Sequence, residues 1–203
     1  LTVASALILH GLLVYPTLLR ILAGVNPLTF LRKMREPMLV AFSTSSSGAT
    51  LPVTLRTVEH RIGVNNNVAS FAVPLGATIN MDGTAIMQGV ATVFIAQFFG
   101  YQLGVDALLM VILTATLASI GTAAVPGVGL ITLTLVLGQV GLPIEGIGLI
   151  IGVDRLLDML RTVVNVTGDG TVATIVANSE GQLDKETLRD PNAGAVAQVP
   201  SGT

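Results

Sequence analysis

Apolar residues occur along the chain in long runs, and the polar residues that interrupt these runs are confined to a few places. The first run, Leu1–Leu22, is almost uninterrupted. About 20 apolar residues are what a helix needs to cross a hydrocarbon core of ~30 Å. A polar connector follows at residues 32–36. The pattern therefore predicts a membrane-spanning helix within residues 1–30.

Three later apolar runs are broken in the middle by serine, glycine, proline or an acidic residue. Irregular backbone at membrane depth is tolerated only where it is buried in protein or lines a cavity. Interrupted apolar segments are also the sequence sign of a transporter site built from discontinuous helices. We therefore expect two re-entrant helical hairpins with a broken helix between them. The runs and their interruptions are Pro37–Val53 with 43–48, Phe71–Gly100 with Gly76–Gly83, and Ala107–Leu137 with Gly121–Gly127.

The end of the chain divides into an apolar segment and a polar one. A last helix is predicted over Ile144–Ala177, after a turn at residues 141–143. Residues 179–203 are polar and contain proline and glycine, which predicts a flexible tail. Residues 31–178 then form one core, and the fold class expected for the chain is an all-α membrane protein.

Composition supports a membrane location and argues against a nucleic-acid partner. Of 203 residues, 51% are hydrophobic and 11% are charged, and the mean hydropathy is +0.78. A soluble domain has roughly 25% charged residues. The net charge of -2 and the lack of a basic stripe argue against a nucleic-acid partner. The chain starts within an apolar run and has no basic region before it, so we expect no signal peptide and a longer parent protein.

Polar side chains recur along one face of the last predicted helix. Apart from Arg155, they are spaced four, three, four and four residues apart, which places them on a face about 80° wide at ~100° per residue. A charge at the bilayer centre costs at least ~2.5–3.5 kcal/mol. A seam of ion pairs is the alternative, but buried pairs stabilise poorly compared with apolar packing. The pattern favours a functional site. Its polar residues are Asp154, Arg155, Asp158, Arg161, Asn165 and Asp169.

The residue types on this face match the groups of an α-amino dicarboxylic acid. An arginine offers a two-pronged donor to a carboxylate, and an aspartate can accept hydrogen bonds from an ammonium group. The oxygens of Asn165 and Asp169 are the ligands that hard cations prefer. The face therefore predicts a binding site for an acidic amino acid and a cation.

Four motifs occur in order along the chain, each on the element where it is expected. Together they make the chain resemble the glutamate/aspartate transporters of the dicarboxylate/amino acid:cation symporter family, from about Phe30 to about Gly181. The resemblance implies the glutamate-transporter fold in part, with hairpins near 37–57 and 107–138, an unwound helix near 67–99 and a last helix near 144–178. The family's earlier helices, which form most of a trimer scaffold, are largely absent. The motifs are Ser45–Pro52, Gly76–Thr84, Ala118–Gly127 and Asp158–Asp169.

The resemblance also implies roles for particular residues in substrate binding. Arg161 would hold the side-chain carboxylate of the substrate, and Asp158 its ammonium group. The other implied substrate-binding residues would complete a polar cage or close it from the hairpin tips. They are Asn165, Thr162 and Thr84 in the cage, and Ser47, Val125 and Gly129 at the tips.

Three sodium sites are implied in the same way. Asp169 and an intact motif from Asn80 to Thr84 favour Na+ over protons as the coupling ion, with Na+ co-transported. The sites would be Gly76, Asn80, Asn165 and Asp169 for the first; Thr78, Ser119, Ile120 and Thr122 for the second; and Asn80 with Asp82 for the third.

The predicted function is secondary active symport, in which inward Na+ flow drives uptake of aspartate or glutamate by alternating access. The expected setting is the inner or plasma membrane, with a multi-pass topology, contact with the lipid bilayer and a homotrimer held by the missing scaffold. A proton-coupled carrier of C4-dicarboxylates or glutamate is the alternative, although a C4-dicarboxylate gives Asp158 no ammonium group to bind.

Two other classes fit the residues less well. An intramembrane enzyme needs a nucleophile and a base at matching depth. The chain has no cysteine and no Gly-x-Ser-x-Gly motif, so we do not expect an enzyme. A channel can also be built from hairpin tips, but a selectivity filter has no need for a cage of arginine, aspartate and asparagine.

Overall fold

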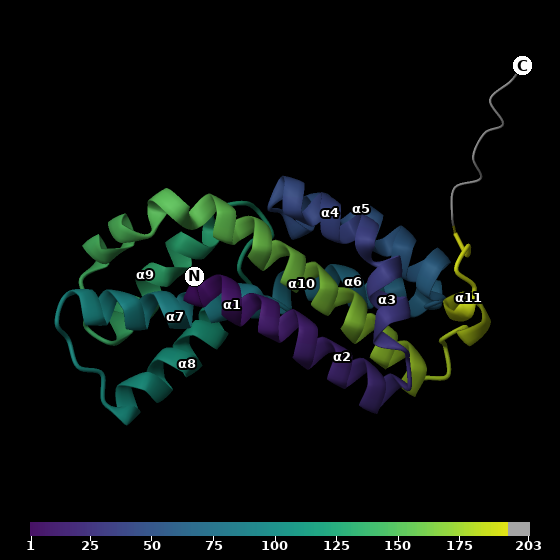
Figure 1. Cartoon of the computed structure of the whole chain (residues 1–203), viewed down its shortest axis with the longest axis horizontal. Helices are drawn as coiled ribbons and strands as arrows, with labels where there is room; N and C mark the ends of the chain where they lie inside the picture. Colours follow the sequence, from purple (N-terminus) through teal and green to yellow (C-terminus); the bar gives the residue numbers. More distant parts are fainter. Residues whose placement is uncertain (195–203) are drawn as a thin grey trace, which may run out of the picture.

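A computed structural model of the chain describes residues 1–194. These residues form helices joined by short turns, with one isolated bridge between Val64 and Leu183 as their only strand-like pairing. The all-helical class predicted from the sequence is confirmed. The longest helix, α10 (Ile151–Ser179), runs through the middle of an elongated molecule, and helices from both ends contact it (Figure 1).

The first helix is continuous from Thr2 to Ala23 but contains two π-helical turns. It consists of α1 (Thr2–Leu9), a π-helical turn at His10–Val14, α2 (Tyr15–Leu18) and a second such turn at Leu19–Ala23. Within residues 1–194 it alone is long and apolar enough to span a membrane. Wide π-helical turns often mark functional positions, and the first of these turns begins at His10.

A helical hairpin follows a short connecting helix, α3 (Pro27–Lys33). Its two arms are α4 (Arg35–Thr44) and α5 (Ser47–Thr57), which continues as a π-helical turn to Ile62. The tip is sharp because Ser45 adopts a left-handed conformation with φ 53°. The Ser46 hydroxyl then accepts a hydrogen bond from the Ala49 N–H at 3.1 Å and caps α5. The serine run therefore ends one helix and starts the next.

The next two helices are separated by a short non-helical break. The helix α6 (Asn66–Ile79) ends before Asn80, and α7 (Asp82–Phe98) begins after Met81. The Asn80 N–H still donates to the Gly76 carbonyl at 2.7 Å. Side chains of this break contact α10: Asn80 Nδ2 donates to Asp169 at 3.1 Å, and the Met81 sulfur lies 3.2 Å from Asn165 Nδ2.

A second pair of helices, α8 (Val105–Ser119) and α9 (Val128–Gln139), is joined by an irregular loop. A 3₁₀ segment (Ile144–Leu149) leads from α9 to α10. The expected start of the last helix at Ile144 was therefore wrong, because α10 begins at Ile151. Glycine disfavours regular helix, and a Cβ on Gly146 would lie 2.4 Å from a methyl carbon of Ile95.

Two apolar clusters hold the helices together, and α10 joins them. One cluster combines the first hairpin, α3 and α6, and includes Phe30 and Met34. The other lies among α7, α8 and α9, and includes Met87 and Leu133. The start of α10 packs on the second cluster and its C-terminal half on the first. The polar stretch of α10 is therefore positioned between the two apolar clusters.

Part of the expected flexible tail is folded against the first hairpin. A short helix, α11 (Lys185–Arg189), lies beside α3 (Figure 1). The buried Lys33 ammonium explains this contact, because it donates to the carbonyls of Arg61 at 2.5 Å, Thr187 at 2.7 Å and Asp190 at 2.8 Å. Burial and the nearby Arg61 guanidinium lower the pKa of Lys33. Residues 195–203 of the expected tail lie outside the described residues.

Replacing Lys33 with methionine should loosen this C-terminal segment. The substitution leaves three carbonyls without their donor, which should reduce the free energy of local opening by about 1–3 kcal/mol. Hydrogen exchange at residues 182–190 measures the change. Lys185→Met removes an exposed lysine from α11 and should leave exchange unchanged. Equal protection in both variants would show that Lys33 does not hold the segment.

Candidate functional site

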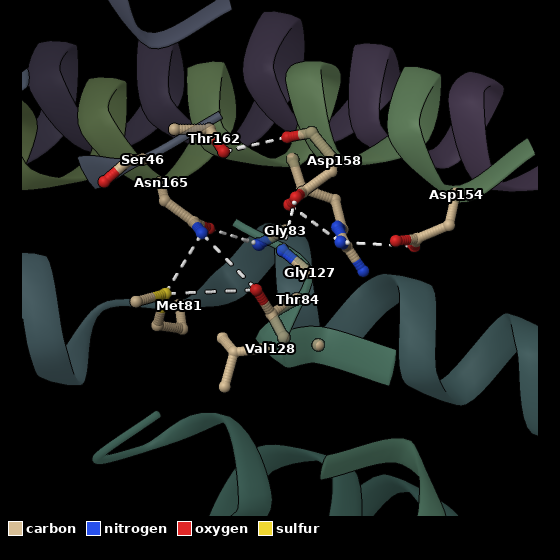
Figure 2. A network of polar contacts seen from close by, with 12 residues as sticks. Ser46, Met81, Gly83, Thr84, Gly127, Val128, Asp154, Asp158, Thr162 and Asn165 are labelled. Carbon is tan, nitrogen blue, oxygen red and sulfur yellow. Dashed lines mark hydrogen bonds and ion pairs between the residues drawn. The ribbon is translucent and has the colours of Figure 1, made fainter. Parts of the chain in front are cut away.

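The centre of the site is Arg161, whose side chain is 1% exposed. Its Nη2 donates to Asp158 Oδ1 at 2.7 Å and lies 3.3 Å from Asp154 Oδ1 (Figure 2). Its Nε and Nη1 have no hydrogen-bond partner within residues 1–194. Buried donors are rarely left unpaired. The guanidinium is therefore suited to receive a further anionic group.

The neighbouring carboxylate connects α10 to the second pair of helices. Asp158 Oδ2 accepts a hydrogen bond from the Gly127 N–H at 2.9 Å, just before α9 begins. The Thr162 hydroxyl donates to the Asp158 carbonyl one turn back. One carboxylate oxygen of Asp158 therefore accepts from Arg161, and the other accepts from the loop between α8 and α9.

Asn165 links α10 to the start of α7. Its Oδ1 accepts from the Gly83 N–H at 2.8 Å. Its Nδ2 lies 3.2 Å from the Met81 sulfur and 3.5 Å from the Thr84 hydroxyl oxygen. Figure 2 shows the three side chains with these contacts dashed. The break between α6 and α7 thus brings Met81 and Thr84 to the same amide.

The tips of the two helix pairs meet over this group. The Ser46 hydroxyl donates to the Ala124 carbonyl at 2.6 Å, and the Gly48 N–H donates to the same oxygen at 3.1 Å. The cavity beneath has a volume of only about 20 Å³, which is room for about one water molecule. An amino acid can enter only if one of the tips moves.

Seven of the eight residues predicted to bind substrate line this cavity, and the eighth, Arg161, is bonded to one of them. Glycine at position 129 allows the Arg161 guanidinium to lie against α9, since a Cβ there would lie 2.6 Å from Arg161 Nη1. The lining residues are Ser47, Thr84, Val125, Gly129, Asp158, Thr162 and Asn165. The structure brings them together from both hairpins, α7 and α10, while their individual roles stay predictions.

The residues predicted for the first cation site also lie together. Asp169 is 2% exposed, and its Oδ1 accepts from Asn80 Nδ2 at 3.1 Å. The same Asn80 amide donates to the Asn165 carbonyl at 3.3 Å. A Cβ on Gly76 would lie 2.7 Å from Asp169 Oδ1, so only glycine permits this contact. A buried carboxylate close to a backbone carbonyl suits a hard cation.

The other two predicted cation sites are arranged differently. The Thr78 carbonyl accepts from the Gly121 N–H at 2.9 Å, which joins the end of α6 to the loop of Ser119, Ile120 and Thr122. Asp82 instead accepts hydrogen bonds from Tyr15 at 3.0 Å and from His10 at 3.2 Å. Within residues 1–194, no three His, Cys, Asp or Glu side chains cluster as a metal site. A cation here would depend on backbone and amide oxygens.

Comparison with known proteins decides the family. Residues 1–179 match the family described as the sodium:dicarboxylate symporter family. The chain belongs to this family. It is similar to the mouse "Excitatory amino acid transporter 3", with 49% identity over 198 residues, and to a Caenorhabditis elegans "Excitatory amino acid transporter", with 47% identity over 184 residues. It is also 45% identical to the human "Excitatory amino acid transporter 5" over 177 residues.

These alignments cover most of this chain but only part of each relative. They include 98%, 90% and 87% of the chain, and 37%, 37% and 32% of the respective relatives. The chain therefore spans about a third of the length of the curated relatives that it matches. The four motifs predicted membership of this symporter family, and the comparison confirms it.

Several residues that shape the site were not predicted from the sequence of the chain. Asp154 was noted only as part of the charged face, yet it is buried beside Arg161. His10 and Tyr15 reach Asp82 from more than 60 positions away along the chain. The periodicity of the charged face gives Asp154 four residues before Asp158, and this spacing was the available signal. Nothing local marks His10 or Tyr15.

Replacing Gly83 with alanine should lower the stability of the protein, although alanine adds only one methyl group. The new Cβ would lie 2.7 Å from the Arg161 carbonyl oxygen and 3.0 Å from its Cα. Backbone atoms cannot rotate away, so α7 and α10 must separate, at about 1–3 kcal/mol for overpacking. The midpoint of thermal unfolding should fall. Gly89→Ala on the same helix meets no atom within 4 Å, and it should not lower the midpoint. A similar decrease for both variants would contradict the role of this contact.

Proposed function

We propose that the protein carrying this chain is a cation-coupled symporter of acidic amino acids, and that this chain supplies the substrate site. The observation that carries the proposal is the buried Arg161 guanidinium, which has two unpaired donors and lies beside a carboxylate between two helical tips. The names of the relatives, which call them excitatory amino acid transporters, agree with this chemistry.

The groups around Arg161 match the three charges of aspartate or glutamate. The side-chain carboxylate of the substrate would take the free Nε and Nη1 donors in a two-pronged contact. The ammonium group would bind Asp158, which then exchanges its bond to Arg161 for one to the substrate. The α-carboxylate would lie near the N-terminal ends of α5 and α9, where helix dipoles favour negative charge.

Closure would depend on the loop between α8 and α9. Its contacts to the rest of the site are few, chiefly Ala124 with the first tip and Gly127 with Asp158. A substrate ammonium that competes for Asp158 would weaken one of these contacts. We propose that this loop opens to admit substrate, and that both helix pairs are re-entrant hairpins around a broken helix, as in transporters with discontinuous helices.

Sodium is the proposed coupling ion. The family name includes sodium, and Asp169 offers a buried carboxylate for it, held by the Asn80 side-chain amide. Asn80 and Asn165 belong to both the cation cluster and the polar cage network. Cation binding that orders these side chains would raise substrate affinity, and linkage requires the reciprocal effect. Transport across a cell membrane by a multi-pass homotrimer belongs to the same proposal.

Calorimetry on the full-length protein in detergent tests the proposal directly. L-Aspartate should bind in sodium chloride and fail to bind when choline replaces sodium. Binding in both media would favour the proton-coupled alternative. A C4-dicarboxylate such as succinate serves as the control substrate: it lacks the ammonium group, so it should bind more weakly than aspartate if Asp158 has the proposed role. Succinate that binds as tightly as aspartate would overturn that role.

A further inference from the structure

Basic side chains are concentrated at one end of the molecule. No lysine or arginine occurs between Ile62 and Asp154. The segments that carry most basic residues, α3, the end of α5 and α11, lie together at one end in Figure 1. The opposite end carries Asp106 and Glu145. Cytoplasmic ends of membrane proteins are enriched in lysine and arginine, which predicts that this basic end faces the cytoplasm.

An apolar groove opens at the basic end, between α3, α4 and α10. It has a volume of about 480 Å³, and its walls include Leu31, Met38 and Val163. Leu39 and Phe42 extend along it and are 62% and 40% exposed. The exposed side chains of the groove are therefore mostly hydrocarbon.

The groove continues along the helices instead of ending at the surface. A second apolar hollow shares Leu31, Met38 and Val163 with it and reaches Leu7 and Leu12 of the first helix and its π-helical turn. The two hollows form a track that leads from the basic end toward the middle of the molecule. A continuous apolar track of this kind fits an extended acyl chain.

Two arginines, Arg32 and Arg35, line the groove at the basic end. Both are exposed, and neither makes a hydrogen bond or ion pair within residues 1–194. Other basic residues nearby are already used: Arg56 pairs with Glu36, and Lys33 binds three carbonyls. Arg32 and Arg35 therefore place two positive charges that have no ion pair among the described residues where the apolar track begins.

We propose that this groove binds one anionic phospholipid of the cytoplasmic leaflet, with its phosphate on Arg32 and Arg35 and an acyl chain along the track. The cytoplasmic leaflet is rich in anionic lipids, and basic pockets between helices on that side are suited to their headgroups. Arginine is matched to phosphate by its planar pair of donors. The bound lipid would join the first helix to the first hairpin through surfaces that touch neither substrate nor cation.

The test uses the full-length protein, purified and exchanged into nanodiscs of phosphatidylcholine with a minor fraction of phosphatidylglycerol. Native mass spectrometry after mild delipidation counts the phosphatidylglycerol molecules retained by each protein. Arg32→Gln with Arg35→Gln should reduce retention at least fivefold. Arg20→Gln with Lys185→Gln is the matched control, because it removes the same charge from exposed residues at the same end and should leave retention unchanged.

Two further variants separate a built site from general attraction. Leu39→Trp fills the groove without changing charge, and it should also reduce retention. Arg32→Lys with Arg35→Lys keeps the charge and should retain more lipid than the glutamine pair, which guards against a folding defect. Equal retention in all variants, or an equal loss in the control pair, would overturn the proposal. The readout does not depend on aspartate binding, so it fails or succeeds separately from the proposed transport function.

Discussion

The Arg161→Ala variant of the full-length protein is expected to lose measurable binding of L-aspartate while it keeps its fold. The guanidinium is buried and donates to Asp158, which lines the cavity, and its Nε and Nη1 are the donors proposed for the substrate carboxylate. Removing one partner of a buried charge pair costs about 2–5 kcal/mol. Affinity should therefore fall by about 30-fold to several thousand-fold. Calorimetry in saturating sodium measures the loss.

The same substitution should change which substrate is accepted. Without the guanidinium, Asp158 still offers a carboxylate to an ammonium group, and the cavity gains space. A small neutral amino acid such as serine should then compete better than aspartate. Arg155→Ala removes an exposed arginine from the same helix and should leave aspartate binding intact. An unchanged aspartate affinity in Arg161→Ala would overturn the assignment of the carboxylate site.

Loss of Arg161 also leaves Asp154 and Asp158 without their common partner. Two buried carboxylates with no cation between them repel each other, so part of the effect could arise from the fold instead of the site. The double variant Arg161→Ala with Asp154→Asn removes that repulsion. If its thermal midpoint returns toward the original value while aspartate binding stays lost, the binding defect belongs to the arginine.

The sequence predicted the parts of the fold that depend on local pattern. Apolar runs located the helices, and the serine run at 43–48 predicted the tip that Ser45 and Ser46 form. Residues Gly121–Gly127 predicted the loop between α8 and α9 within two residues. These signals succeed because a left-handed turn or a helix cap depends on the residues at that position, whatever the rest of the chain does.

Features that depend on distant partners were beyond the sequence. Lys33 appeared to be one more charge in a polar connector, but it binds carbonyls of Thr187 and Asp190, more than 150 positions away. Tyr15 lies in an apolar run and contacts Asp82 only because two helices pack side by side. Hydrophobic periodicity carries no information about which polar groups meet across such an interface. The start of α10 at Ile151 likewise depends on how Gly146 packs on Ile95.

Replacing Asp169 with asparagine is expected to affect sodium more than substrate. The side chain keeps its size, so the contacts with Gly76 and Asn80 can persist, but the buried negative charge is lost. Cation affinity depends strongly on the number of charged ligands. The sodium concentration that gives half-maximal aspartate binding should rise by about tenfold or more. Asp106→Asn, at the exposed start of α8, should not change it.

Linkage distinguishes this defect from that of Arg161. When a variant weakens only cation binding, aspartate affinity falls at low sodium and recovers as sodium saturates the site. Asp169→Asn should therefore regain most of its aspartate affinity at high sodium, while Arg161→Ala should stay defective at every sodium concentration. An Asp169→Asn titration that matches the original protein would remove Asp169 from the cation site. If high sodium also fails to restore aspartate binding in Asp169→Asn, the two clusters do not act as separate cation and substrate sites. The contacts that Asn80 and Asn165 share between them would then make the clusters one unit.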